Sequence, residues 1–210
     1  MQIISRQHQV GGASRPSLRC PSCRQIGVFE AIANLHDVQV FHPTPYALGI
    51  KLCPSRNCGA MVFTIMDSSS TVLQSFPPEL IDFDATSLPK PILKCFEEAL
   101  TCHANGCHVA CAIMVRRTLE LLCDAKSASG KNLKDRIANL KSKVVLPSEL
   151  FTAMDELRLL GNDAAHIEAQ TYEEVSIEET EAAIELTKEI LKSVYQLDDL
   201  VKRLQALKKT

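Results

Sequence analysis

The chain has 210 residues, of which 46% are hydrophobic and 23% charged, a composition typical of a globular protein with a real core. Its formal net charge of −2 argues against a protein that coats nucleic acid indiscriminately through charge. No window approaches the roughly 18 apolar residues that a membrane-spanning helix needs.

The first residues contain no apolar core of signal-peptide length, so we expect a cytoplasmic protein with no membrane partner. The chain has nine cysteines. In a reducing cytoplasm, paired cysteines indicate a metal site before they indicate disulfides.

In chain order, residues 1–17 are polar, contain Gly11 and Gly12, and are predicted to form a flexible N-terminal arm. Residues 18–76 contain short β-rich runs such as "DVQVF", "YALGIKL" and "AMVFTIM", separated by Pro, Asn, Gly and Ser. This pattern predicts a small β unit.

Two cysteine pairs within this unit predict a metal site. They occur in "CPSC" and "CPSRNC", which supply Cys20, Cys23, Cys53 and Cys58. Two tight turns that each offer two thiolates meet the demand of tetrahedral zinc for four converging ligands. We therefore predict a zinc ribbon with one structural zinc ion, because four cysteines leave no open coordination position. Free thiols and a redox pair at Cys20 and Cys23 are the alternatives.

Residues 77–90 are rich in proline and are predicted to be a linker. Residues 91–210 have helical periodicity and begin with a first-turn proline, Pro91. The predicted fold class is therefore α+β, a small β zinc ribbon followed by an all-α bundle. The last helix is expected from about Tyr172 to Lys208.

Two features of the helical part favour self-association. Residues 126–143 carry six Lys or Arg against one Asp, whereas residues 148–185 carry eleven Asp or Glu against one Arg. The last helix also has a coiled-coil spacing of apolar residues at Ile190, Val194, Leu197, Val201 and Leu204. We predict a homodimer.

The stretch "CHANGCHVAC" at residues 102–111 interleaves cysteine and histidine at spacings that resemble a second metal site. Cys107 and Cys111 are four residues apart within an apolar helix, however, and cysteine packs well as a small hydrophobe. We predict that these cysteines are core residues.

The stretch "RLLGNDAAH" places Arg158, Asn162 and His166 at i, i+4 and i+8, on one face of a continuous helix. A cation, an amide and an imidazole on one stripe suit contact with a phosphodiester. They suit hydrogen bonding to a neighbouring helix equally well.

The order of these segments resembles the prokaryotic family catalogued as domain of unknown function 4145. The shared pattern is a proline-flanked entry, an Ala-rich helix ending in Arg-x-x-Leu-Glu, a short Leu/Ile helix, and Leu-Arg-x-x-Gly-Asn-x-x-Ala-His. In this chain the Arg-x-x-Leu-Glu element falls at Arg117 to Glu120, with Arg116 as an alternative arginine. The Leu-Arg-x-x-Gly-Asn-x-x-Ala-His element falls at Leu157 to His166. Members of this family commonly carry an N-terminal cysteine ribbon.

The family is considered similar to HEPN domains, helical bundles that occur in toxin and defence proteins. Members of the family also occur fused to restriction-enzyme subunits. Many HEPN proteins are metal-independent ribonucleases with an Arg-x(4–6)-His motif, in which histidine moves a proton and arginine stabilises charge on the phosphate. The resemblance implies His166, Asn162 and Arg158 as the corresponding catalytic candidates.

The chain departs from that motif in its spacing. Seven residues separate Arg158 from His166, and the arginine of the compact Arg-Asn-x-x-x-His form is replaced by Gly161. The alternative is a structural network in which Asn162 and His166 join residues of the Arg-x-x-Leu-Glu helix, namely Arg116, Arg117 and Glu120.

We therefore expect a non-catalytic module that recognises nucleic acid or protein, in a bacterial defence or stress context. RNA, DNA and a defence or restriction protein are the expected partners. A metal-independent endoribonuclease is the first alternative, and a structural adaptor that binds protein partners is the second.

Overall fold

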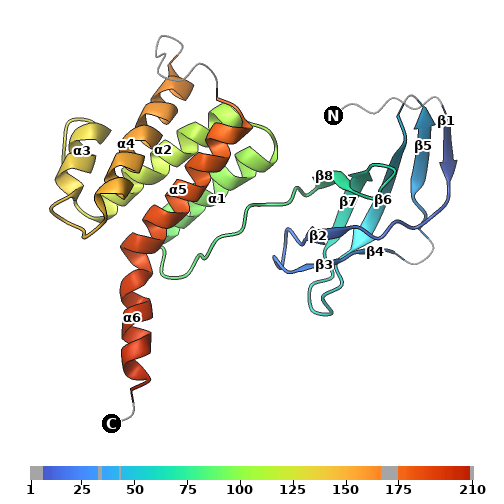
Figure 1. The fold of residues 1–210 in the computed structure, drawn as a ribbon, viewed down its shortest axis with the longest axis horizontal. Coiled ribbons are helices and arrows are strands. Elements are labelled where there is room, and N and C mark those ends of the chain that lie inside the picture. The colour runs from blue at the N-terminus through green and yellow to red at the C-terminus, as the bar shows by residue number, and fades with distance from the viewer. Residues whose placement is uncertain (1–6, 33–34, 43, 167–174, 209–210) are drawn as a thin grey trace. The chain divides into compact units, whose positions relative to one another are not determined.

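The computed structural model describes residues 7–32, 35–42, 44–166 and 175–208. The chain divides into two compact units, residues 1–82 and 83–210. In the described residues the first unit is built of strands and the second of six helices (Figure 1), which confirms the predicted α+β class. None of these helices is both long and apolar enough to cross a membrane.

The helical unit consists of α1 to α6. Their bounds are α1 Lys90–Ala104, α2 His108–Ala125, α3 Leu133–Leu140, α4 Ser148–Ala165, α5 Ile177–Tyr195 and α6 Leu197–Ala206. α2 packs against α1, α4 and α5 and is the centre of the bundle (Figure 1). Its buried side chains include Val115, Leu119 and Leu122.

Local sequence explains where several helices begin. Pro91 lies in the first turn of α1, where its missing N–H costs no hydrogen bond. The Asn132 side chain accepts a hydrogen bond from the N–H of Asp135 and caps α3. Ser176 and Glu179 form a capping box at α5. At α4 the cap position is Pro147, and no side chain caps this helix.

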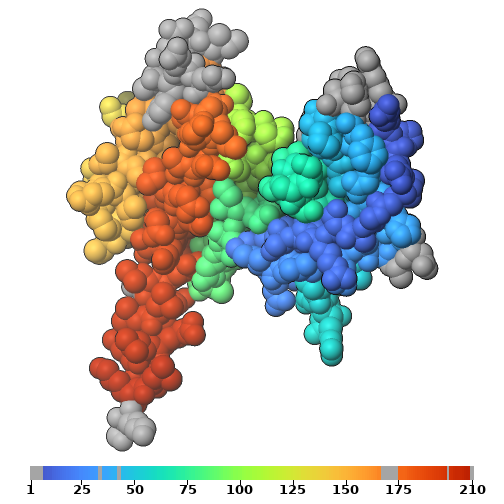
Figure 2. Space-filling view, turned by 45° about the vertical axis from the view of Figure 1, so that its right-hand side comes forward, coloured from blue at the N-terminus to red at the C-terminus, as the bar shows by residue number. Residues whose placement is uncertain are grey.

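The expected last helix is divided at Gln196 into α5 and α6. The Gln196 amide donates hydrogen bonds to the carbonyl oxygens of Asp84 (2.8 Å) and Thr86 (3.1 Å), which holds the entry segment against this junction. The expected start near Tyr172 lies outside the described residues. In Figure 2 α6 extends as a column beyond the rest of the helical unit.

The coiled-coil spacing expected along this helix does not form one continuous buried seam. Ile190 is fully buried in the bundle, whereas Leu197, Val201 and Leu204 on α6 are 47–70% exposed. The cause is geometric, because α6 continues past the point where α1 and α2 offer it a surface.

The β unit has an antiparallel sheet in the order β1-β5-β6-β7-β8, with β4 pairing with β6, and a separate β2-β3 hairpin. The strands are β1 Gln7–Val10, β2 Ser17–Arg19, β3 Ile26–Val28, β4 Glu30–Ala31, β5 Val38–His42, β6 Tyr46–Leu52, β7 Met61–Met66 and β8 Val72–Phe76. β1 and its pairing with β5 replace the expected flexible arm between residues 7 and 10.

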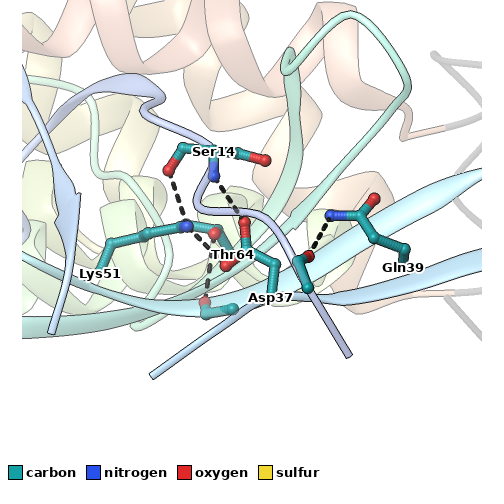
Figure 3. A network of polar contacts seen from close by, with 7 residues as sticks. Ser14, Asp37, Gln39, Lys51 and Thr64 are labelled. Carbon is teal, nitrogen blue, oxygen red and sulfur yellow. Dashed lines mark hydrogen bonds and ion pairs between the residues drawn. The ribbon is translucent and has the colours of Figure 1, made fainter. Parts of the chain in front are cut away.

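A buried ion pair holds this N-terminal segment against the sheet (Figure 3). Lys51 Nζ donates to Asp37 Oδ1 and to the carbonyl oxygen of Ser14, at 2.7 Å each. The Ser14 N–H in turn donates to Asp37 Oδ2 at 2.7 Å. Both charged side chains are at most 1% exposed, so each depends on the other to offset the cost of desolvation.

Gly49 makes room for this pair. A Cβ atom at Gly49 would lie 1.9 Å from Asp37 Oδ1, so a larger residue would displace the carboxylate. Lys51 and Gly49 share the buried face of β6, and Ile50 and Leu52 lie on its exposed face. The usual pattern is reversed here, because the covered face carries charge and the open face is apolar.

Candidate functional site

The four paired cysteines converge in the β unit. The Sγ atoms of Cys20, Cys23, Cys53 and Cys58 all lie within 4.8 Å of one another. Two of the separations, Cys20 to Cys58 and Cys23 to Cys53, are 3.7 Å. Thiolates placed about 2.3 Å from one ion at tetrahedral corners are about 3.8 Å apart. The cluster therefore fits a tetrahedral metal ion, and these four cysteines could hold one.

The two knuckles have the same backbone plan. Cys20 and Cys23 follow β2, and the Cys20 N–H donates to the carbonyl oxygen of Gln25 at 2.9 Å. Cys53 and Cys58 follow β6, and the Cys53 N–H donates to the carbonyl oxygen of Ala60 at 2.9 Å. Each loop is thus closed by a hydrogen bond that begins at its first cysteine.

In both loops the residue after the second cysteine has a left-handed backbone conformation. Arg24 has φ 62° and Gly59 has φ 64°. This conformation turns the backbone back towards its strand, and glycine adopts it without steric cost. At Arg24 the same turn is imposed on a residue with a Cβ atom, so closure of the knuckle outweighs the local strain there.

The surroundings shift the pKa values of the individual thiols in different directions. The backbone N–H of Ala60 donates to the Cys58 sulfur and, as the largest cause, lowers the pKa of Cys58 to about 7. Burial raises the pKa of Cys53 to about 12. An ion that binds here must displace the proton of Cys53, so binding releases protons and weakens as the pH falls.

The cluster is enclosed by Leu18, Phe29 and Val62, the apolar residues of the same small core. Four thiolates around one ion leave no position for water or substrate. The arrangement therefore suits a structural role, in which the ion joins the β2-β3 hairpin to the β6-β7 loop.

In the helical unit, Gly161 marks a close crossing of α2 and α4. A Cβ atom on Gly161 would lie 2.5 Å from Arg116 Cβ and 3.0 Å from the carbonyl oxygen of Ala112. Gly161 is buried, and the neighbouring helix occupies the space that a side chain would need. The glycine in the motif is thus required by helix packing.

This crossing brings the Arg116 guanidinium into a network between the helices. Its Nε donates to Glu120 Oε1, and its Nη1 donates both to Asn162 Oδ1 and to the carbonyl oxygen of Arg158, each at 3.3 Å. Three of the predicted polar residues, Arg116, Glu120 and Asn162, therefore lie together. Arg117, the next residue on α2, is exposed.

The Arg158 side chain is held within α4. Its Nε donates to Asp155 Oδ1 at 2.7 Å, and the side chain is only 16% exposed. This hydrogen bond lowers the pKa of Asp155, and the positive charges of Lys134 and Lys141 on the basic segment add to the effect. Asp155 was not singled out by sequence, although its position three residues before Arg158 was the available signal.

His166 lies apart from this network. It follows the last residue of α4 with extended backbone angles, φ −133° and ψ 116°, and it is exposed. Its backbone N–H returns to the helix, donating to the carbonyl oxygen of Asn162 at 3.0 Å. The expected stripe therefore holds for Arg158 and Asn162, and the helix ends before it reaches His166.

The second group of cysteines and histidines is packed only in part. His103 Nδ1 and His108 Nδ1 lie 2.9 and 3.0 Å from Thr180 Oγ1, which ties α5 to α1 and α2. Cys111 is fully buried, as predicted, whereas Cys107 is exposed. In the part of the chain that the structure describes, Cys20, Cys23, Cys53 and Cys58 form the single group of three or more metal-type ligands at such close range.

The fold and the site together define a protein with a cysteine-clustered β unit and an all-α unit whose central helices are joined by an arginine network. Residues 97–208, more than half of the chain, match the family model described as Domain of unknown function (DUF4145), and the chain belongs to this family. The match extends from α1 to α6 and includes the Gly-Asn-x-x-Ala-His element, while the cysteine knuckles lie outside it. No curated protein matches the chain. No solved structure matches it.

Replacing Gly161 by Ala should destabilise the helical unit. The clash with Arg116 Cβ outweighs the roughly 1 kcal/mol that alanine gains over glycine in a helix, so we expect a net loss of ~1–2 kcal/mol. His166→Ala, directly after the end of the same helix, is the control and should change stability by less than ~0.5 kcal/mol, because the imidazole is exposed. Urea unfolding followed by circular dichroism measures both. Equal effects of the two substitutions would contradict this assignment.

Proposed function

We propose that the protein is a non-catalytic recognition module that binds a protein partner. The observation that carries this proposal is that polar groups of the motif bond to one another and do not face a shared site. Arg116, Asn162 and the Arg158 carbonyl are joined to one another across the α2-α4 crossing, while His166 is exposed beyond the helix end. Of the three side chains expected to act on a substrate, Asn162 is bonded between two helices, Arg158 is bonded to Asp155 within α4, and His166 lies apart from both.

A ribonuclease of the expected kind needs an imidazole and a cation that reach the same phosphodiester. Arg158 is directed to Asp155 and is largely buried, so reaching a substrate would cost it an ion pair. The arginine of the compact motif would have to replace Gly161, where no side chain fits. These contacts favour recognition over cleavage.

The exposed apolar surface favours a protein partner over nucleic acid. On the open face of the sheet, Ile50, Leu52, Met61 and Phe76 are each 39–61% exposed. Strand register places Leu52 opposite Met61, and Phe63 between Ile50 and Phe76, so these side chains form one patch. Contiguous exposed apolar groups are typical of protein interaction sites, whereas nucleic-acid sites are basic.

We further propose that the ion at the cysteine cluster is a single structural zinc ion. Zinc prefers tetrahedral thiolate coordination, and four thiolates at these separations suit it. The small β unit has few buried apolar side chains of its own, so an ion that joins its two loops would contribute much of its stability.

Cys53→Ser should therefore lose the metal and unfold the β unit, while the helical unit keeps most of its helical signal. Cys107→Ser, which alters an exposed thiol in the other unit, is the control and should keep one ion per chain. Elemental analysis after purification without chelator, with circular dichroism, measures both effects. A wild-type protein that contains no metal would refute the proposal.

The unmodified protein should leave single-stranded RNA intact in EDTA. Gly161→Arg, which rebuilds the Arg-Asn-x-x-x-His sequence, should also be inactive, because the added side chain has no space in the crossing. Cleavage is followed on a fluorescently labelled RNA by gel electrophoresis. Cleavage by the wild type that disappears in His166→Ala would overturn the non-catalytic proposal in favour of an endoribonuclease.

A further inference from the structure

Cys102 and Cys107 lie at the two ends of the turn that joins α1 to α2. Two hydrogen bonds across this turn define a Schellman motif. The Cys107 N–H donates to the carbonyl oxygen of Cys102 at 2.8 Å, and the Gly106 N–H donates to that of His103 at 2.9 Å. Gly106, at φ 72°, is the left-handed residue that this motif needs. The first and last side chains of a Schellman motif commonly pack against each other, and here both are thiols.

The backbone of this turn meets the distance that a disulfide requires. A 2.8 Å hydrogen bond between the two residues keeps their Cα atoms within about 6.7 Å, because standard bond lengths fix how far each Cα lies from the bonded N or O atom. Disulfide-bonded cysteines usually have Cα atoms about 4.4–6.8 Å apart. The Cys107 Sγ atom lies 3.9 Å from the carbonyl oxygen of Asn105, a weak contact that rotation of the side chain can exchange for a bond to sulfur.

The histidines that follow the two cysteines hold this turn in place. The Nδ1 atoms of His103 and His108 lie 2.9 and 3.0 Å from one atom, Thr180 Oγ1, and the two ring centroids are 5.7 Å apart. Thr180 is fully buried in the helical unit. The end of α1 and the start of α2 are therefore tied to the same point on α5, which fixes Cys102 and Cys107 relative to each other.

The four cysteines between residues 95 and 111 differ in their access to solvent. Cys107 is exposed and Cys102 is half-buried, whereas Cys95 and Cys111 are buried. Burial raises the pKa of Cys111 to about 12. Burial, followed by the charges of Cys107 and Glu98, also raises the pKa of Cys102. A dissolved oxidant therefore reaches Cys107 first, and Cys102 is placed to react with the product.

We propose that Cys102 and Cys107 are a redox-active thiol pair that a peroxide converts into an intramolecular disulfide. In the first step the Cys107 thiolate attacks one oxygen of hydrogen peroxide, forms a sulfenic acid and releases hydroxide. In the second step the Cys102 thiolate attacks the Cys107 sulfur and expels the sulfenic oxygen as hydroxide, and the S–S bond forms. The two hydroxide ions take up the two thiol protons. The pair thus gives up two electrons and two protons, and the peroxide becomes two molecules of water.

The thiol pair is separate from the sites described above. The cysteine cluster belongs to the β unit, and the Arg116 network lies at the crossing of α2 and α4. The thiol pair lies where α1, α2 and α5 meet. It adds a response to oxidants that recognition of a partner does not require.

The test maps the disulfide in the full chain. The protein is treated with hydrogen peroxide, unfolded, alkylated and digested with trypsin without reduction. Cleavage after Lys94 and Arg116 gives one peptide, residues 95–116, which contains no cysteine of the metal-type cluster. It contains all four cysteines of this region, namely Cys95, Cys102, Cys107 and Cys111.

We expect this peptide to carry two alkyl groups in place of four and to lose two hydrogen atoms. Fragmentation should assign the bond to Cys102 and Cys107. Dithiothreitol applied before alkylation should restore four alkyl groups, because a small dithiol reduces the disulfide by exchange.

Single substitutions identify the two partners independently. Cys107→Ser and Cys102→Ser should each abolish the disulfide. Cys111→Ala is the matched control, because it removes a buried thiol four residues from Cys107 and keeps the position apolar. This variant should form the disulfide as the wild type does. Circular dichroism before oxidation verifies that the helices of each variant are intact.

Four results would overturn the proposal. They are four alkylated cysteines after peroxide treatment, a disulfide that includes Cys95 or Cys111, a disulfide between two chains, and oxidation of Cys107 to the sulfinic acid while Cys102 stays a thiol. The peptide map of the wild type distinguishes these results without any variant. None of them bears on metal binding or RNA cleavage, which are measured separately.

Discussion

The close approach of α2 and α4 is the constraint on which the helical unit depends. Gly161 allows the helices to meet at a distance that no side chain at this position would permit. At that distance the Arg116 guanidinium reaches both the Asn162 side chain and the Arg158 carbonyl of the facing helix. These groups are partly buried, so their hydrogen bonds to one another replace part of the contact with water that they lose on folding. The Asn162 side chain of the motif is therefore used between the helices.

The β unit is organised by a different constraint, the convergence of two loops from separate hairpins. The knuckles have the same hydrogen-bonded closure and the same left-handed residue after the second cysteine, so each presents its thiols in the same way. On the sheet, the Asp37–Lys51 pair joins the N-terminal segment to β5 and β6. Polar contacts therefore fix the arrangement of segments within each unit. In the β unit these contacts are the cysteine cluster and the Asp37–Lys51 pair, and in the helical unit they are the hydrogen bonds of Arg116.

Local patterns in the sequence were sufficient for much of this structure. Short β-rich runs such as "YALGIKL" and helical periodicity after Pro91 predicted the α+β class, and the spacing of the cysteines predicted which four side chains converge. Long-range polar pairings were not predictable in this way. Nothing near Lys51 indicates that Asp37 and Ser14 will enclose it, and a pattern that continues through Ala165 does not show that α4 ends there. His166 was therefore placed on a stripe that it does not reach.

The central claim is that Arg116 and Asn162 act on each other across the crossing of α2 and α4. A double-mutant cycle with Arg116→Ala, Asn162→Ala and the double variant, measured by urea unfolding of the full chain, tests it most directly. The structure predicts a coupling free energy of ~0.5–2 kcal/mol, because loss of either partner already breaks their shared hydrogen bond. Stability losses that add within ~0.3 kcal/mol would show that the two side chains act independently and would contradict the account.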